Sequence, residues 1–269
     1  MYIPPGYKLI KEYPRSKKIL AKCKDNKGRL QYIYHPDYVN KQKKIKYCEL
    51  IKFINKIDEI KKELKKDIKS KDIKTQMIAT ILTISLKCGL RIGNDKYERL
   101  YNSTGLTTLK ESNIRGNKIS FIGKKGVYNE CIVDDNTKKI LKKLSKYDNS
   151  QKYVFSYKTD RGKSKIRADD VNKYLLKFGD FTTKYFRTYN ANMKFIENMN
   201  NISYETEKER KNQMKEALIK TAKSLNHTPA ICKKSYISDK VYEYIKNKEI
   251  KVKSPEKLYK KIIGSCYRN

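Results

Sequence analysis

The chain has 269 residues, which is enough for one large domain or for a large domain with a small companion. Its 64 Lys and Arg residues outnumber the 29 Asp and Glu residues, and the formal net charge of +35 points to a polyanionic partner, most simply nucleic acid. No apolar run approaches the roughly 20 residues of a membrane span and the first residues lack signal-peptide character, so we expect neither a membrane protein nor a secreted one.

Residues 1–38 predict a small β-rich segment. Residues 19–21 and 30–34 are short strand candidates on either side of a polar turn that contains a glycine. Strand alternation places Tyr32 and Tyr34 on one face, with cationic side chains nearby. Such a face suits either a sugar-phosphate surface or a small hydrophobic core.

The rest of the chain, residues 39–269, predicts a mainly α-helical domain, so the expected fold class is α+β. Apolar residues at helical spacing predict helices over residues 39–66, 74–87, 136–148, 168–178, 204–225, 239–248 and 255–265, with another beginning near residue 181 under a threonine cap. The helix over 74–87 is nearly apolar, which indicates burial, and Gly89 ends it. A β-hairpin is predicted over 117–133 with Lys124 in its turn, and residues 157–167 read as a basic loop.

The cysteines carry no metal-binding or redox signature. They are far apart and include no Cys-x-x-Cys pair, and the chain has only two histidines. We therefore expect no zinc site and no other metal or cofactor. We also expect reduced thiols in an intracellular compartment at Cys23, Cys48, Cys88, Cys131, Cys232 and Cys266.

The stretch over residues 222–237 combines groups that suit phosphate chemistry. Thr228 and Pro229 form a helix start, with threonine as the cap and proline at the first helical position. Tyr236 follows two turns later, and His227 precedes the start. A phenol near an imidazole and several lysines is a candidate nucleophile toward a phosphate. The ordinary alternative is a structural tyrosine near a hydrogen-bonded histidine.

Four separated segments, in chain order, resemble the type IB DNA topoisomerases, most closely the compact poxvirus-like and giant-virus-like enzymes: CGLRIGN, FIGKKGV, KYFRTYNAN and LNHTPAICKKSYI. The segment DNKGRLQYIY is similar to the region just upstream of that family's catalytic domain. The resemblance implies a DNA breaking-rejoining fold acting on double-stranded DNA. It implies relaxation of supercoils through a transient 3′-phosphotyrosyl nick, by a monomer, without ATP or metal.

Carried over residue by residue, the resemblance assigns Tyr236 as the nucleophile. Arg91 and Arg187 would grip the non-bridging oxygens of the scissile phosphate, and His227 would donate a hydrogen bond to one of them. Lys124 would be the general acid that protonates the leaving 5′ oxygen. Supporting or DNA contacts are implied at Tyr32, Tyr34, Tyr97, Lys184 and Asn192.

The chain departs from the family pattern at two places. The N-terminal β-rich segment is about half the usual length, which implies either a shortened DNA clamp over residues 1–38 or a truncated chain. Lys125 occupies a position that is commonly acidic, which bears on how Lys124 is held.

Two other functions fit parts of the pattern. A tyrosine recombinase or integrase shares the catalytic set, but it commonly carries histidine three residues before the second arginine, where this chain has Lys184. A non-catalytic basic DNA-packaging protein predicts that Tyr236→Phe changes nothing. For a viral chain the topoisomerase prediction places the protein in the virion or viral factory, and otherwise in the nucleus or nucleoid.

Overall fold

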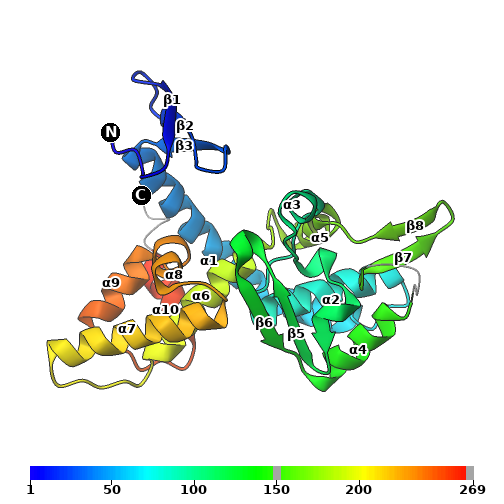
Figure 1. Ribbon diagram of the computed structural model, residues 1–269. Coiled ribbons are helices and arrows are strands. Elements are labelled where there is room, and N and C mark those ends of the chain that lie inside the picture. The colour runs from blue at the N-terminus through cyan, green and yellow to red at the C-terminus, as the bar shows by residue number, and fades with distance from the viewer. Residues whose placement is uncertain (148–152, 265–269) are drawn as a thin grey trace. The chain divides into compact units, whose positions relative to one another are not determined.

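The computed structural model describes residues 1–147 and 153–264, and its small antiparallel sheets and many helices confirm the predicted α+β class (Figure 1). The chain forms two compact units, of which the first comprises Met1–Glu49 and the second begins at Leu50. The division falls inside helix α1 (Pro36–Asp67), whose N-terminus lies three residues earlier than the helix predicted from the sequence. A domain boundary at residue 38 remains a prediction.

The first unit is a three-stranded antiparallel sheet followed by the start of α1. Its strands are β1 (Lys8–Glu12), β2 (Ile19–Lys24) and β3 (Leu30–Tyr34), in that order across the sheet. The two strands predicted from the sequence are confirmed, and β1 is an exposed strand that apolar alternation does not mark. In the turn between β2 and β3, Asp25 accepts hydrogen bonds from the backbone N–H groups of Lys27 and Arg29, both at 3.0 Å. This polar turn fixes the pairing of the two strands.

The second unit is mainly helical. Its helices after α1 are α2 (Ile73–Cys88), α3 (Asp95–Tyr101), α4 (Asp135–Ser145), α5 (Ala168–Leu175), α6 (Lys184–Met199), α7 (Glu207–Ser224), α8 (Pro229–Ser235), α9 (Asp239–Asn247) and α10 (Pro255–Ile263). Helix α2 is buried along most of its length, as its apolar sequence predicts. Asp72 caps its first turn by accepting from Thr75 N–H at 2.9 Å. Gly89 ends it with φ of +63°, a conformation that favours glycine.

Two hairpins complete the second unit. Strands β4 (Ile114–Arg115), β5 (Lys118–Ile122) and β6 (Tyr128–Ile132) form one antiparallel sheet in that order, which confirms the predicted hairpin and its turn at Lys124. Strands β7 (Ser156–Thr159) and β8 (Gly162–Lys165) pair where a basic loop was expected, so that expectation was wrong. Backbone pairing builds this second hairpin although its residues are mostly polar, and the Thr159 hydroxyl donates to the Gly162 carbonyl at 2.9 Å.

Helices α7, α9 and α10 pack against α6, and α8 packs against α7 (Figure 1). Beside α6 lies an aromatic cluster centred on Phe53, whose ring is 5.2 Å from the ring of Phe186. Thr183 precedes α6, but its backbone is already helical and its side chain makes no capping bond, so the expected threonine cap at this helix is absent. Thr206 and Thr228 do cap α7 and α8. Within the described ranges no helix is long and apolar enough to cross a membrane.

Candidate active site

Tyr236 lies at the C-terminal end of the short helix α8. The Thr228 side chain caps the start of this helix by accepting from Ile231 N–H, and Pro229 occupies its first turn. At the other end, Tyr236 N–H donates to the Cys232 carbonyl at 3.0 Å. The ring of His227 stacks on the ring of Tyr236, with centroids 4.9 Å apart and an interplanar angle of 6°. The local fold therefore holds the phenol and the imidazole face to face.

Arg91 reaches the same phenol from the segment that follows α2. Its Nη2 donates to Tyr236 Oη at 3.2 Å. The backbone of this segment is fixed because the Arg91 carbonyl accepts from Leu106 N–H at 3.0 Å. The approach of the two backbones depends on glycine, since a Cβ on Gly105 would collide with the Cα of Gly93.

Arg187 lies on α6 and is only 4% exposed. Its Nη1 donates to the Gly89 carbonyl, and its Nη2 donates to the Leu225 carbonyl at 2.9 Å. Its Cζ is 5.4 Å from the centre of the Tyr236 ring. One guanidinium thus joins the end of α2 to the end of α7 and faces the phenol.

Several buried nitrogen atoms at this site have no hydrogen-bond partner among the described residues. They are Nε of Arg187, which is a donor, and the two ring nitrogens of His227, of which one is a donor when the imidazole is neutral. Buried polar atoms in folded proteins are nearly always paired, so unpaired ones in one small volume indicate a site for an external acceptor. A phosphate oxygen is such an acceptor, and guanidinium and imidazole N–H groups are suited to it.

The charges of the site act on its titratable groups. Burial raises the pKa of Tyr236, but the positive charges of Arg187 and Arg91 and their hydrogen bonds outweigh burial, so the net pKa lies below the ordinary value. Burial, followed by the charges of the same two arginines, lowers the pKa of His227 from 6.5 to about 4. Burial and the charge of Arg91 lower the pKa of Arg187 to about 10. At neutral pH Arg187 is therefore a cation and the imidazole of His227 is neutral.

Asn192 holds the backbone around Tyr236 from α6. It is completely buried, and its side chain donates to the carbonyls of Thr188 at 2.7 Å and Tyr236 at 2.9 Å. Its Oδ1 accepts from Ser238 N–H at 2.9 Å. A side chain without exposed surface has no room for the DNA contact expected at Asn192 from the sequence, so the geometry favours the supporting role.

The remaining sequence-predicted residues lie outside this cluster. Lys124 is exposed in the hairpin turn, where its Nζ is 5.5 Å from the centre of the Tyr97 ring. Tyr97 is an exposed residue of α3. Lys184 is exposed at the first turn of α6. Tyr32 and Tyr34 are exposed on β3 of the first unit, with ring centroids 6.4 Å apart.

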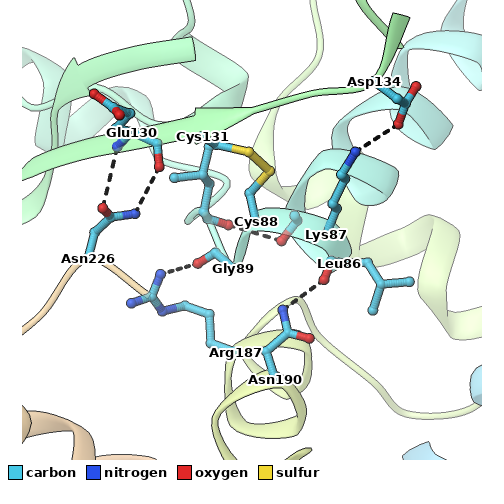
Figure 2. The surroundings of a disulfide bond; sticks show 12 residues. Leu86, Lys87, Cys88, Gly89, Glu130, Cys131, Asp134, Arg187, Asn190 and Asn226 are labelled. Carbon is cyan, nitrogen blue, oxygen red and sulfur yellow. Dashed lines mark hydrogen bonds and ion pairs between the residues drawn. A yellow bond between two sulfur atoms is a disulfide. The ribbon is translucent and has the colours of Figure 1, made fainter. Parts of the chain in front are cut away.

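The expectation of reduced thiols was wrong for Cys88 and Cys131, and also for Cys48, which is disulfide-bonded too, while Cys266 lies outside the described residues. Cys88, the last residue of α2, forms a disulfide with Cys131 of β6, and their Cα atoms are 5.8 Å apart (Figure 2). The two residues are 43 positions apart, and no spacing motif marks them. Cys23 and Cys232 are free, buried thiols. The residues that the structure describes include no group of three or more His, Cys, Asp or Glu side chains that could hold a metal ion.

Comparison with known proteins identifies the family. The family model of the eukaryotic DNA topoisomerase I catalytic core matches residues 35–262, so the chain belongs to this family. The DNA topoisomerase 1B of Acanthamoeba polyphaga mimivirus is 29% identical over 243 residues, which cover 83% of this chain and 71% of the relative. The DNA topoisomerase 1 of Rabbit fibroma virus (strain Kasza) is 28% identical, with 82% and 70% covered. The DNA topoisomerase 1B of Vaccinia virus (strain Copenhagen) is 26% identical, with 83% and 71% covered.

These matches confirm the family resemblance drawn from the sequence and favour it over the recombinase alternative, since each of the relatives is named a DNA topoisomerase. Sequence reasoning did not find Asn226, whose carboxamide binds the backbone of β6, nor the pairing of Cys88 with Cys131. A positive φ of 53° at Asn226 is visible only in the structure.

Proposed function

We propose that this protein relaxes supercoiled duplex DNA by cutting and resealing one strand through a covalent bond between Tyr236 and a 3′ phosphate. The observation that carries the proposal is a phenol of lowered pKa surrounded by buried cationic and imidazole donors, some of them without a partner in the described chain. The family match and the viral topoisomerase relatives support the same activity.

The chemistry follows from the charges. Tyr236 Oη attacks the phosphorus, and negative charge grows on the non-bridging oxygens of the five-coordinate transition state. Arg91, Arg187 and the neutral His227 supply preorganised donors for that charge, and each such donor is typically worth about 10² to 10³ in rate. The two guanidinium charges also favour the phenolate, so no separate base is needed to begin the attack.

The leaving group is the 5′ oxygen of the cut strand, which needs a proton. Lys124 is the general acid in this proposal, and it recovers the proton when the 5′ oxygen attacks the phosphotyrosine on resealing. The exposed hairpin turn leaves its ammonium free to meet the duplex. The bond energy stays in the phosphotyrosine, so the cycle requires neither ATP nor a metal ion. While the strand is open, its 5′ end rotates and supercoils are released.

DNA contacts outside the reacting centre fall on the exposed residues Tyr32, Tyr34, Tyr97 and Lys184 in this proposal. Aromatic side chains interleaved with cations suit a sugar-phosphate backbone. The protein acts as a monomer on duplex DNA, since the proposed catalytic groups all come from one chain. It works where that DNA lies: in the virion or viral factory for a viral chain, and otherwise in the nucleus or nucleoid.

The test is relaxation of a supercoiled plasmid by the wild type and by Tyr236→Phe. Catalytic amounts of wild type should relax the plasmid in the presence of EDTA, and Tyr236→Phe should bind DNA without relaxing it. Denaturing a wild-type reaction in progress should trap protein on the 3′ side of a nick. Attachment to a 5′ end would contradict the role of Lys124. Relaxation that requires stoichiometric protein assembled in tetramers would favour a recombinase.

A further inference from the structure

Strand β6 is attached to the active-site segments at two successive residues. β6 is an edge strand of its sheet, so part of its backbone has no strand partner. At Glu130 the side chain of Asn226 pairs with this free backbone in place of a strand. Its Oδ1 accepts from the Glu130 N–H and its Nδ2 donates to the Glu130 carbonyl, both at 3.4 Å. At the next residue, Cys131 is joined to Cys88 by the disulfide. Figure 2 shows the two attachments side by side.

Each attachment leads to a different catalytic group. Cys88 is followed by Gly89, whose carbonyl accepts from Arg187, and Arg91 comes two residues later. Asn226 directly precedes His227. The hairpin that contains β6 has Lys124 in its turn. The two attachments therefore tie the segment of the proposed general acid to the segments that hold the proposed phosphate-binding groups.

The turn that holds Lys124 is closed by its own hydrogen bonds, from Gly123 N–H to the Val127 carbonyl at 2.8 Å and from Gly126 N–H to the Gly123 carbonyl at 3.1 Å, so the place of this turn depends on how the hairpin strands are attached. The side chain of Lys124 is exposed, and Lys125 beside it has a positive φ of 64° in the turn. Strand β5 is held by its pairing with β4 and by a hydrogen bond from Thr104 N–H to the Ile122 carbonyl at 2.9 Å. Among the described residues, β6 pairs with β5, is hydrogen-bonded to Asn226 and is linked by the disulfide to Cys88. A misplacement of about 1 Å in a catalytic group can cost about 10² in rate.

We propose that the Cys88–Cys131 disulfide is a positioning cross-link for the general acid, so that its formation speeds proton delivery by Lys124 to the leaving 5′ oxygen. This inference rests on the proposed function. Oxidation converts the two thiols to one disulfide by exchange with a small disulfide, which is reduced to two thiols and so balances the protons and electrons. Cys131 is partly exposed, which gives such reagents access.

The cross-link predicts a dependence on the leaving group. A duplex with sulfur in place of the bridging 5′ oxygen at the cleavage site releases a thiol of pKa about 8.5, which leaves as a thiolate without a general acid. An effect that works through Lys124 should slow cleavage of the oxygen substrate and spare the sulfur substrate. A general disturbance of the fold or of Arg91 should slow both.

The experiment measures single-turnover cleavage of both duplexes by the full-length protein, oxidised with glutathione disulfide or reduced with dithiothreitol. Mass spectrometry of alkylated protein reports the state of the pair. We expect reduction to slow the oxygen substrate about 10- to 100-fold and to change the sulfur substrate less than about twofold. Since dithiothreitol acts on every disulfide, Cys131→Ser and Cys88→Ser are the controls. Each should resemble the reduced wild type in both conditions.

Three results would overturn the inference: equal rates for the oxidised and reduced wild type, equal slowing of both substrates, or both cysteines remaining alkylatable after oxidation. Failure of the proposed function gives a different result, because no covalent complex would then form on either duplex in any redox state.

Discussion

The imidazole of His227 should be neutral in the folded protein far below the pH at which free histidine gains its proton. Its pKa falls from 6.5 to about 4 because the ring is buried and faces Arg187 and Arg91. Between these two values the unfolded chain binds more protons than the folded one, so stability must fall as the pH falls through this window. At 1.36 kcal/mol for each pKa unit the full shift corresponds to about 3 kcal/mol. Because the residue is only half-buried, solvent screening reduces the expected loss between pH 7 and pH 4 to about 1–2 kcal/mol.

The substitution that isolates this effect is His227→Gln, which keeps an N–H donor and removes the titration. Urea unfolding of the wild type and the variant at intervals from pH 7 to pH 4 gives the difference in free energy of unfolding at each pH. The carboxylates titrate equally in both proteins, so their contributions cancel in this difference in free energy of unfolding. We expect the variant to gain about 1–2 kcal/mol relative to the wild type as the pH falls to 4.

Cleavage should follow the same logic. A neutral imidazole acts as a single hydrogen-bond donor, so His227→Gln should keep most of the activity and His227→Ala should lose about 10² in rate. The reasoning would be refuted if the difference in free energy of unfolding between the wild type and His227→Gln stayed the same from pH 7 to pH 4. A fall in wild-type cleavage rate with a midpoint near pH 6.5 that is absent in the Gln variant would refute it too.

Three further substitutions test other parts of the site. Arg187→Ala should lower the single-turnover cleavage rate by about 10² to 10³. It should also lower the free energy of unfolding in urea by about 2–5 kcal/mol, because two buried carbonyls lose their donor. Unchanged stability would contradict the bridging role. Gly105→Ala should slow cleavage about 10²-fold, because the added Cβ displaces Gly93 near Arg91. DNA affinity in a binding titration should be unchanged. Cleavage at the wild-type rate would show that the segment adjusts to the Cβ without moving Arg91. Asn192→Ala should slow cleavage and lower the free energy of unfolding by about 1–3 kcal/mol, and weakened DNA binding with normal stability would restore the DNA contact to this residue.

Local chemistry explains which parts of the fold could be predicted from the sequence. The ends of α2 and α8 could be located because Gly89 and the Thr228–Pro229 pair have one dominant structural meaning each. The hairpin of β7 and β8 could not, because its residues are mostly polar and show no apolar alternation. Helix α3 was missed since it is short and none of its residues is buried. In both elements the structure depends on backbone pairing or capping rather than on a hydrophobic face.

The candidate site likewise has a part that could be predicted from the sequence and a part that could not. Family resemblance picked out Arg91, Arg187, His227 and Tyr236 from three remote segments, but no sequence pattern gives the 3.2 Å contact of Arg91 with the phenol. The Cys88–Cys131 pair and the binding of Asn226 to β6 join segments that only the folded chain brings together. Contacts between remote residues follow from packing, which single-sequence periodicity does not encode.

The position of Arg187 has an evolutionary consequence. Its guanidinium closes the joint between the ends of α2 and α7 through two carbonyls while it faces the phenol. A lineage that abandoned catalysis could discard the Tyr236 hydroxyl with little harm to folding, but it could not discard Arg187 without rebuilding that joint. Inactive descendants of this fold should therefore retain the arginine long after Tyr236 has been replaced, and its presence in a related chain is poor grounds for inferring activity.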